Sequence, residues 1–328
     1  MNAHGHRSST LGAIQSLGGA TFKQLVRDPA LLLIALAALL LIVLAPTYAV
    51  FHFDEGPKVM VDTGLSTALL AGLLVALLGP ARAVAYELED RTALTLLSKP
   101  VSRMTLVIGK YVGVLAALAV MLAPLVVAVL YVVRIVDLGE EEGLSNALVE
   151  GAGAVQAAEL RAIYVALAGG GCAAIVAAVA VRRHRAGAAY ATLMTAALVG
   201  MLGGGGASGG RWSVAAAGGL IGLETAVIAA VALAAAVRLG AVGTLCAGIG
   251  VMIAGHWRAL AGTAEGSGLL GGLGGVVPGL EVLNALEPAA AGAPIRPVYV
   301  AWAAVYGTMY ALAALQVGAA LMHGREVA

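Results

Sequence analysis

Ser208 and His256 are the residues of this chain whose types could perform covalent chemistry. Ser208 lies in the run Gly206-Ala-Ser-Gly-Gly210, which satisfies the pattern G-x-S-x-G of a serine nucleophile, and His256 could act as its base. The match is weak, because residues 203–210 are all glycine, alanine or serine, and such a run fits the pattern without any chemistry. We therefore expect no catalytic residue and no enzymatic activity in this chain.

Nucleotide and metal chemistry are also unsupported by the sequence. The phosphate-binding pattern G-x-x-x-x-G-K-[ST] does not occur, because Gly109-Lys110 is followed by tyrosine and has no glycine at the required offset. His4 and His6 stand on a polar terminus, where histidines are usually solvated. Cys172 and Cys246 have no partner at metal or redox spacing. We expect this chain itself to bind no cofactor and no metal.

Ionisable residues are scarce inside the apolar runs. The main candidates are Glu224, near one end of an apolar run at 214–237, and Arg82, near one end of a run at 63–85. A transporter that couples to protons or ions usually carries several charges along its path through the membrane. Their scarcity argues against ion coupling. A position of Glu224 at the membrane interface also fits the sequence.

The composition predicts the elements that must position these residues. Of 328 residues, 61% are apolar, and the mean hydropathy is +0.96. The apolar residues fall in runs of about 20, the length that an α-helix needs to cross ~30 Å of hydrocarbon. This pattern predicts an all-α, polytopic membrane protein. A net charge of +1 without a basic patch excludes nucleic-acid binding.

The hydropathy pattern predicts eight spans, after a polar leader at 1–29 and within one transmembrane domain at 30–328. They lie at about residues 30–50, 63–85, 105–133, 162–181, 186–202, 214–237, 241–255 and 298–322. The basic clusters, densest at Arg182–Arg185, place both termini in the cytoplasm under the positive-inside rule. Spacings such as Gly109–Gly113 and Gly218–Gly222 would permit close helix approach, although with 45 glycines they arise easily by chance.

Residues 257–297 contain no complete span. Their apolar parts are short and rich in glycine, so we expect interfacial or re-entrant helices broken at Pro278, Pro288 and Pro294.

The stretch from Tyr86 to Tyr111 is the polar interruption with the densest ordered charge. It combines charges of both signs, two leucines of an apolar face and a proline: Glu87, Glu89, Asp90, Arg91, Leu96, Leu97, Lys99, Pro100 and Arg103. We expect a short amphipathic helix at the membrane surface, ended by the proline, which cannot continue it. Such a helix would offer a docking surface to a soluble partner.

The pattern Y-E-x-E-x-R-T-x-L-x-L-L-x-x-P-V-S-R, from Tyr86 to Arg103, resembles the signature of type-2 ATP-binding cassette (ABC) permeases. In that family the segment forms a coupling helix that docks on the ATPase subunit, so the resemblance implies this role for the nine residues just named. The stretch VVPGLEVLNALEPAAAGAPI is similar to the family's outer elbow, which would include Pro278, Glu281 and Asn284. The family core has six spans, so we interpret residues 150–212 as an inserted extra pair.

The resemblance implies a permease subunit of an ABC exporter in the bacterial cytoplasmic (inner) membrane. ATP and Mg would bind to a separate ATP-binding subunit, and a second copy of this chain or a similar permease would complete a dimer within the lipid bilayer. One alternative is a membrane scaffold that transports nothing. The other is an intramembrane serine protease similar to the rhomboids, whose histidine motif A-H-x-x-G is not met, because Gly255 precedes His256 and Ala259 replaces the glycine.

Overall fold

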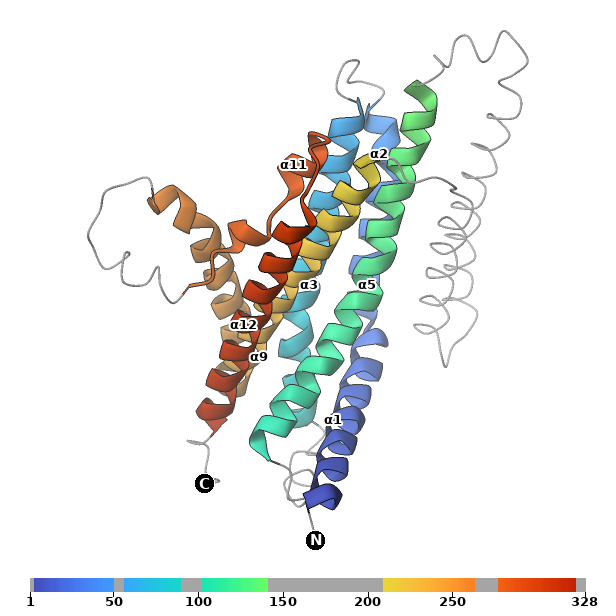
Figure 1. The fold of residues 1–328 in the computed structure, drawn as a ribbon. Coiled ribbons are helices and arrows are strands. Elements are labelled where there is room, and N and C mark those ends of the chain that lie inside the picture. Colours follow the sequence, from blue (N-terminus) through green and yellow to red (C-terminus); the bar gives the residue numbers. More distant parts are fainter. Residues whose placement is uncertain (1–2, 50–55, 90–101, 141–208, 263–276, 323–328) are drawn as a thin grey trace, which may run out of the picture.

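The computed structural model describes residues 3–49, 56–89, 102–140, 209–262 and 277–322 (Figure 1). The elements are α1 (Ala3–Val26), α2 (Pro29–Ala49), α3 (Gly56–Glu89), α5 (Arg103–Glu140), α9 (Gly209–Gly262), the 3-10 helix η1 (Leu280–Leu283), α11 (Leu286–Ala290) and α12 (Pro297–Leu321). Every regular element in these ranges is helical. The all-α prediction is confirmed.

Four of the helices, α3, α5, α9 and α12, are long and apolar enough within the described ranges to cross a membrane. The pair α1 and α2, bent by 63° between them, would make a fifth as one broken span. The spans predicted at 30–50, 63–85, 105–133 and 298–322 coincide with α2, α3, α5 and α12. Those predicted at 162–181 and 186–202 lie outside the described residues, so the total of eight stays a prediction.

Helix α9 folds back on itself at Gly240. This residue has a φ of 65° and a ψ of −174°, a conformation that only glycine adopts readily. A Cβ placed on Gly248 would lie 3.9 Å from the Cβ of Ala232, and these two residues are equally far from Gly240 along the chain. The 54 residues of α9 therefore form a first limb before Gly240 and a second limb after it (Figure 1). The break falls between the spans predicted at 214–237 and 241–255.

The polar leader is helical from Ala3 onward, as α1, and packs along α5. The crossing is close because glycines face each other: a Cβ on Gly113 would lie 2.5 Å from the carbonyl oxygen of Gly18. A Cβ on Gly109 would lie 2.9 Å from the Cβ of Leu17. The Gly109–Gly113 spacing is thus a true helix contact.

Helix α3 lies at the centre of the bundle, packed against α2, α5 and α9. The core includes large side chains that are completely or almost completely buried, such as Leu65, Leu125, Leu220 and Ile228. Helix α12 packs mainly on α9, and its outer face exposes Trp302. Apolar side chains on that outer face suit contact with lipid.

The start of α1, the end of α3, the start of α5 and the end of α12 lie at one end of the bundle (Figure 1). The ends of α2 and α5, together with α11, lie toward the opposite end. Arg238, near the end of the first limb of α9, donates a hydrogen bond of 3.2 Å to the carbonyl oxygen of Leu321 at the end of α12. From α2 onward, the described long helices alternate in direction when the two limbs of α9 are counted separately, as the predicted spans do (Figure 1).

Candidate functional site

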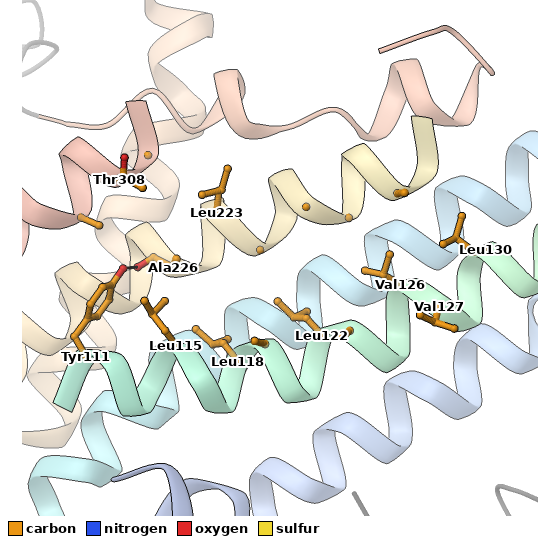
Figure 2. A pocket seen from close by; sticks show the side chains of 18 of the residues that line it. Tyr111, Leu115, Leu118, Leu122, Val126, Val127, Leu130, Leu223, Ala226 and Thr308 are labelled. Carbon is orange, nitrogen blue, oxygen red and sulfur yellow. Dashed lines mark hydrogen bonds between the residues drawn. The ribbon is translucent and has the colours of Figure 1, made fainter. Parts of the chain in front are cut away.

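A cavity of about 820 Å³ lies between α5, the first limb of α9 and α12 (Figure 2). Leucine, valine, alanine and glycine make up almost all of its wall. The hydroxyl of Tyr111 donates to the carbonyl oxygen of Ala226 at 3.0 Å, and that of Thr308 donates to the carbonyl oxygen of Ala304 at 2.8 Å. Both polar side chains of the wall are therefore already engaged within the protein, and the cavity presents an apolar surface.

Two glycines of the first limb of α9 make the cavity deeper. A Cβ placed on Gly219 or Gly222 would meet no atom within 4 Å, whereas one on Gly218 would lie 2.5 Å from the Cγ1 of Val126. Gly218 thus lets α9 approach α5 closely. Gly219 and Gly222 face open space in the cavity. The spacing Gly218–Gly222 resembles a helix-packing motif in the sequence. In the structure its first glycine allows close helix contact, and its second widens the cavity.

Glu224, which is buried, and His256, which is partly exposed, form a pair that joins the two limbs of α9. The side chain of Glu224 is completely buried, and its Oε1 lies 3.5 Å from Nε2 of His256. These residues are also equally far from Gly240, so the pair closes the hairpin. Neither carboxylate oxygen has a hydrogen-bond partner among the described residues. The hairpin thus encloses Glu224, for which the sequence also allowed a place at the interface.

Replacing Glu224 by leucine is expected to leave the free energy of unfolding unchanged or higher. Leucine has a similar size and removes the cost of keeping a carboxylate away from water. His256→Ala is expected to destabilise the fold by about 2 kcal/mol, because it leaves the carboxylate buried with no partner. Unfolding in detergent, followed by circular dichroism, measures both. If Glu224→Leu lowered the free energy of unfolding as much as His256→Ala, this account of the pair would be contradicted.

Asp28 and Arg82 form an ion pair in which only the aspartate is buried. Asp28 is 1% exposed, lies at the bend between α1 and α2, and accepts a hydrogen bond from Arg82 of α3. Its Oδ1 also accepts a hydrogen bond of 2.9 Å from the backbone N–H of Ala30, which caps α2. Sequence reasoning missed this contact, although an aspartate directly before Pro29 and a long apolar run is a typical helix start.

The structure places three of the nine predicted coupling residues. Glu87 and Glu89 lie in the last turn of α3, and Arg103 is the first residue of α5. The other six, Asp90, Arg91, Leu96, Leu97, Lys99 and Pro100, lie outside the described residues. Because α3 and α5 pack against each other, the segment connects two neighbouring helices at one end of the bundle (Figure 1).

The predicted elbow residues lie in and around η1. Pro278 precedes it, Glu281 is exposed within it, and Asn284 follows it, with Oδ1 accepting a hydrogen bond of 3.1 Å from the N–H of Leu286. A Cβ on Gly255 would lie 2.9 Å from the carbonyl oxygen of Pro278, so this glycine lets the elbow pack on the second limb of α9.

One detail of the elbow prediction is wrong. Pro288 lies inside the short helix α11 instead of breaking a helix. It occupies the first turn, where the missing N–H of proline has no partner to lose.

Long apolar helices around an apolar cavity define a multi-pass membrane protein. Residues 9–210 match the family described as ABC-2 family transporter protein. The match covers more than half of the chain, so the chain belongs to this family, whose members are the membrane-spanning permease components of transporters. No curated protein matched the sequence.

The family match and the resemblance in the sequence overlap in part: the pattern from Tyr86 to Arg103 lies inside residues 9–210, and the elbow stretch lies beyond them. The match begins inside α1 and continues through residues 150–210, where we expected an inserted pair of spans. It ends at the start of α9. Family membership supports a transporter over the serine protease alternative. The Nε2 of His256, which would have to serve a serine nucleophile, faces Glu224 instead.

Proposed function

We propose that this chain is the permease subunit of an ABC exporter, driven by ATP that a separate subunit binds with Mg and hydrolyses. The family supports the permease class, and the sequence pattern from Tyr86 to Arg103 supports docking of an ATPase. The observation that carries the proposal is the place of this segment. It connects α3, at the centre of the bundle, with α5, which forms one wall of the cavity.

This placement gives a direct route from the ATPase to the cavity. A displacement of the docking segment would move the end of α3 and the start of α5 together. The contact of Arg82 with Asp28 would carry the movement of α3 to the bend between α1 and α2. The crossing of Gly113 with Gly18 would carry the movement of α5 to α1. Rigid helices in close contact transmit such shifts because packed interfaces deform little.

The proposal includes the orientation and assembly of the subunit. The end of the bundle that holds the docking segment and both termini would face the cytoplasm of a bacterial cell, and the elbow at Pro278, Glu281 and Asn284 would face outward. ATPase subunits act in pairs, so a second copy of this chain or a similar permease would complete a two-fold assembly in the inner membrane.

Reversing the charges of the docking segment is expected to uncouple the ATPase. The solubilised protein is purified from its own membranes and cytosol together with any bound ATPase. With a Glu87→Lys/Arg91→Glu variant, the co-purified ATPase activity should be at least tenfold lower than with wild type. Opposed charges at a docking surface set partner choice and association rate, so reversing two of them repels the partner. The measurement is ATP hydrolysis by the purified material.

The matched control for this variant is Glu287→Lys. Glu287 is exposed on α11, toward the other end of the bundle, and the same type of reversal there should leave the ATPase bound. If no ATPase activity accompanies the wild-type protein, the coupling proposal fails and the scaffold alternative gains support. If both variants lose the ATPase equally, docking at residues 86–103 is wrong.

A further inference from the structure

The apolar cavity has nearly the length of the hydrocarbon core of a bilayer. Its wall on α5 extends from Tyr111 to Leu130, which at ~1.5 Å per residue is roughly 28 Å. The hydrocarbon core measures about 30 Å. The row of α5 side chains from one end of the cavity to the other is visible in Figure 2. A hollow of this length suits a long molecule lying parallel to the helices.

The chemistry of the wall excludes a polar occupant. A water molecule inside a protein is stable when it has two to four polar partners. The two hydroxyls of this wall, on Tyr111 and Thr308, already donate to backbone carbonyls. An ion or a sugar would lose its hydration here without compensation. The contents that this wall can stabilise are apolar.

Gly219 and Gly222 make no close helix contact with any other part of the chain that the structure describes. Glycine is a poor helix former, and its frequent use in membrane helices is explained by close helix approach. At these two positions a Cβ would meet nothing within 4 Å, in contrast to Gly218 and to Gly113. Because these two residues have no side chain, the cavity is wider beside them. A larger residue at either position would narrow it.

We infer that the cavity binds the long alkyl chain of an amphiphilic substrate, which enters it from the bilayer. The membrane supplies alkyl chains at this depth, and the cavity is partly open to its surroundings. The inference rests on the proposed transport function and names the class of its substrate. The head group of such a molecule would remain at one end of the cavity, where the surrounding helices reach the membrane surface.

Filling the cavity provides the test. The full-length protein in lipid nanodiscs is illuminated with a phospholipid that carries a photoreactive diazirine on its acyl chain, and the labelled residues are identified by mass spectrometry. In wild type, we expect labels on partly exposed cavity residues such as Leu115 and Val126, above the level at Trp302 on the outer face. Gly222→Leu should reduce labelling in the cavity about tenfold and leave Trp302 unchanged, because its side chain enters the open space.

Gly250→Leu is the matched control. Gly250 lies on the second limb of the same helix, outside the cavity, and its added Cβ also meets nothing within 4 Å. This variant should be labelled like wild type. Gly219→Leu provides a second filling variant in case Gly222→Leu does not fold. Cavity labelling that stays at the level of Trp302 in wild type, or that survives both filling variants, would overturn the inference.

Two further measurements separate the inference from its alternatives. In a protein with Cys172 and Cys246 replaced by serine, Gly219→Cys should form no disulfide between copies, and an efficient disulfide would show that a second copy covers the cavity instead. The labelling requires no ATPase. Loss of the ATPase with intact cavity labelling would therefore contradict the proposed function alone, whereas a bound, active ATPase without cavity labelling would contradict the alkyl-chain site alone.

Discussion

Replacing Arg82 by alanine should lower the free energy of unfolding by about 3 kcal/mol. The substitution leaves the carboxylate of Asp28, which is 1% exposed, without its charged partner at the bend between α1 and α2. Asp28→Asn should cost less, about 1 kcal/mol. Asparagine can still cap the N–H of Ala30, and Arg82, with its side chain 36% exposed, can reach polar surroundings. Equilibrium unfolding in detergent micelles, followed by far-ultraviolet circular dichroism, gives both values.

The informative result is that Arg82→Ala should destabilise the protein more than Asp28→Asn does. Asp62→Ala, an exposed position in the first half of α3, serves as the control and should change stability by less than about 0.5 kcal/mol. If Asp28→Asn lowered the free energy of unfolding as much as Arg82→Ala, the unpaired buried charge of Asp28 would not explain the loss of stability in Arg82→Ala. We also expect Arg82→Ala to weaken coupling, because Arg82 lies on α3 shortly before the proposed docking segment.

A leucine at Gly113 should separate α1 from α5 and destabilise the protein by about 3 kcal/mol. The Cβ at this position would lie 2.5 Å from the carbonyl oxygen of Gly18 and 3.1 Å from the backbone nitrogen of Phe22. Backbone atoms cannot rotate away as a side chain can, so the helices must move apart and lose their contact. Hydrogen exchange of the α1 amides, measured by mass spectrometry, should rise strongly in this variant.

Gly19→Leu is the control for this crossing. It is adjacent to Gly18 on α1, but its added Cβ would meet nothing within 4 Å, so exchange in α1 should match wild type. Protection of α1 that persists in Gly113→Leu would mean that the leader does not dock on α5. Because α5 begins at the end of the docking segment, loss of this crossing should also reduce transport.

Several of the long helices could be predicted from the sequence alone. Hydrocarbon thickness sets a minimum length for each span, so the runs at 30–50, 63–85, 105–133 and 298–322 could be located from hydropathy alone. The break between 214–237 and 241–255 was predictable because Arg238 and Gly240 interrupt an apolar run. The charged pattern from Tyr86 to Arg103 indicated the family independently of any geometry, since such a pattern is local.

Only the tertiary structure decided which of the polar and small residues work together. Glu224 meets His256, and Asp28 meets Arg82, across intervals for which no local rule predicts contact. The sequence shows Gly109–Gly113 and Gly218–Gly222 as the same four-residue spacing. In the fold, the first pair packs against α1, whereas Gly222 opens into the cavity. The difference arises because spacing fixes the face of a helix on which residues lie, but not what lies opposite that face.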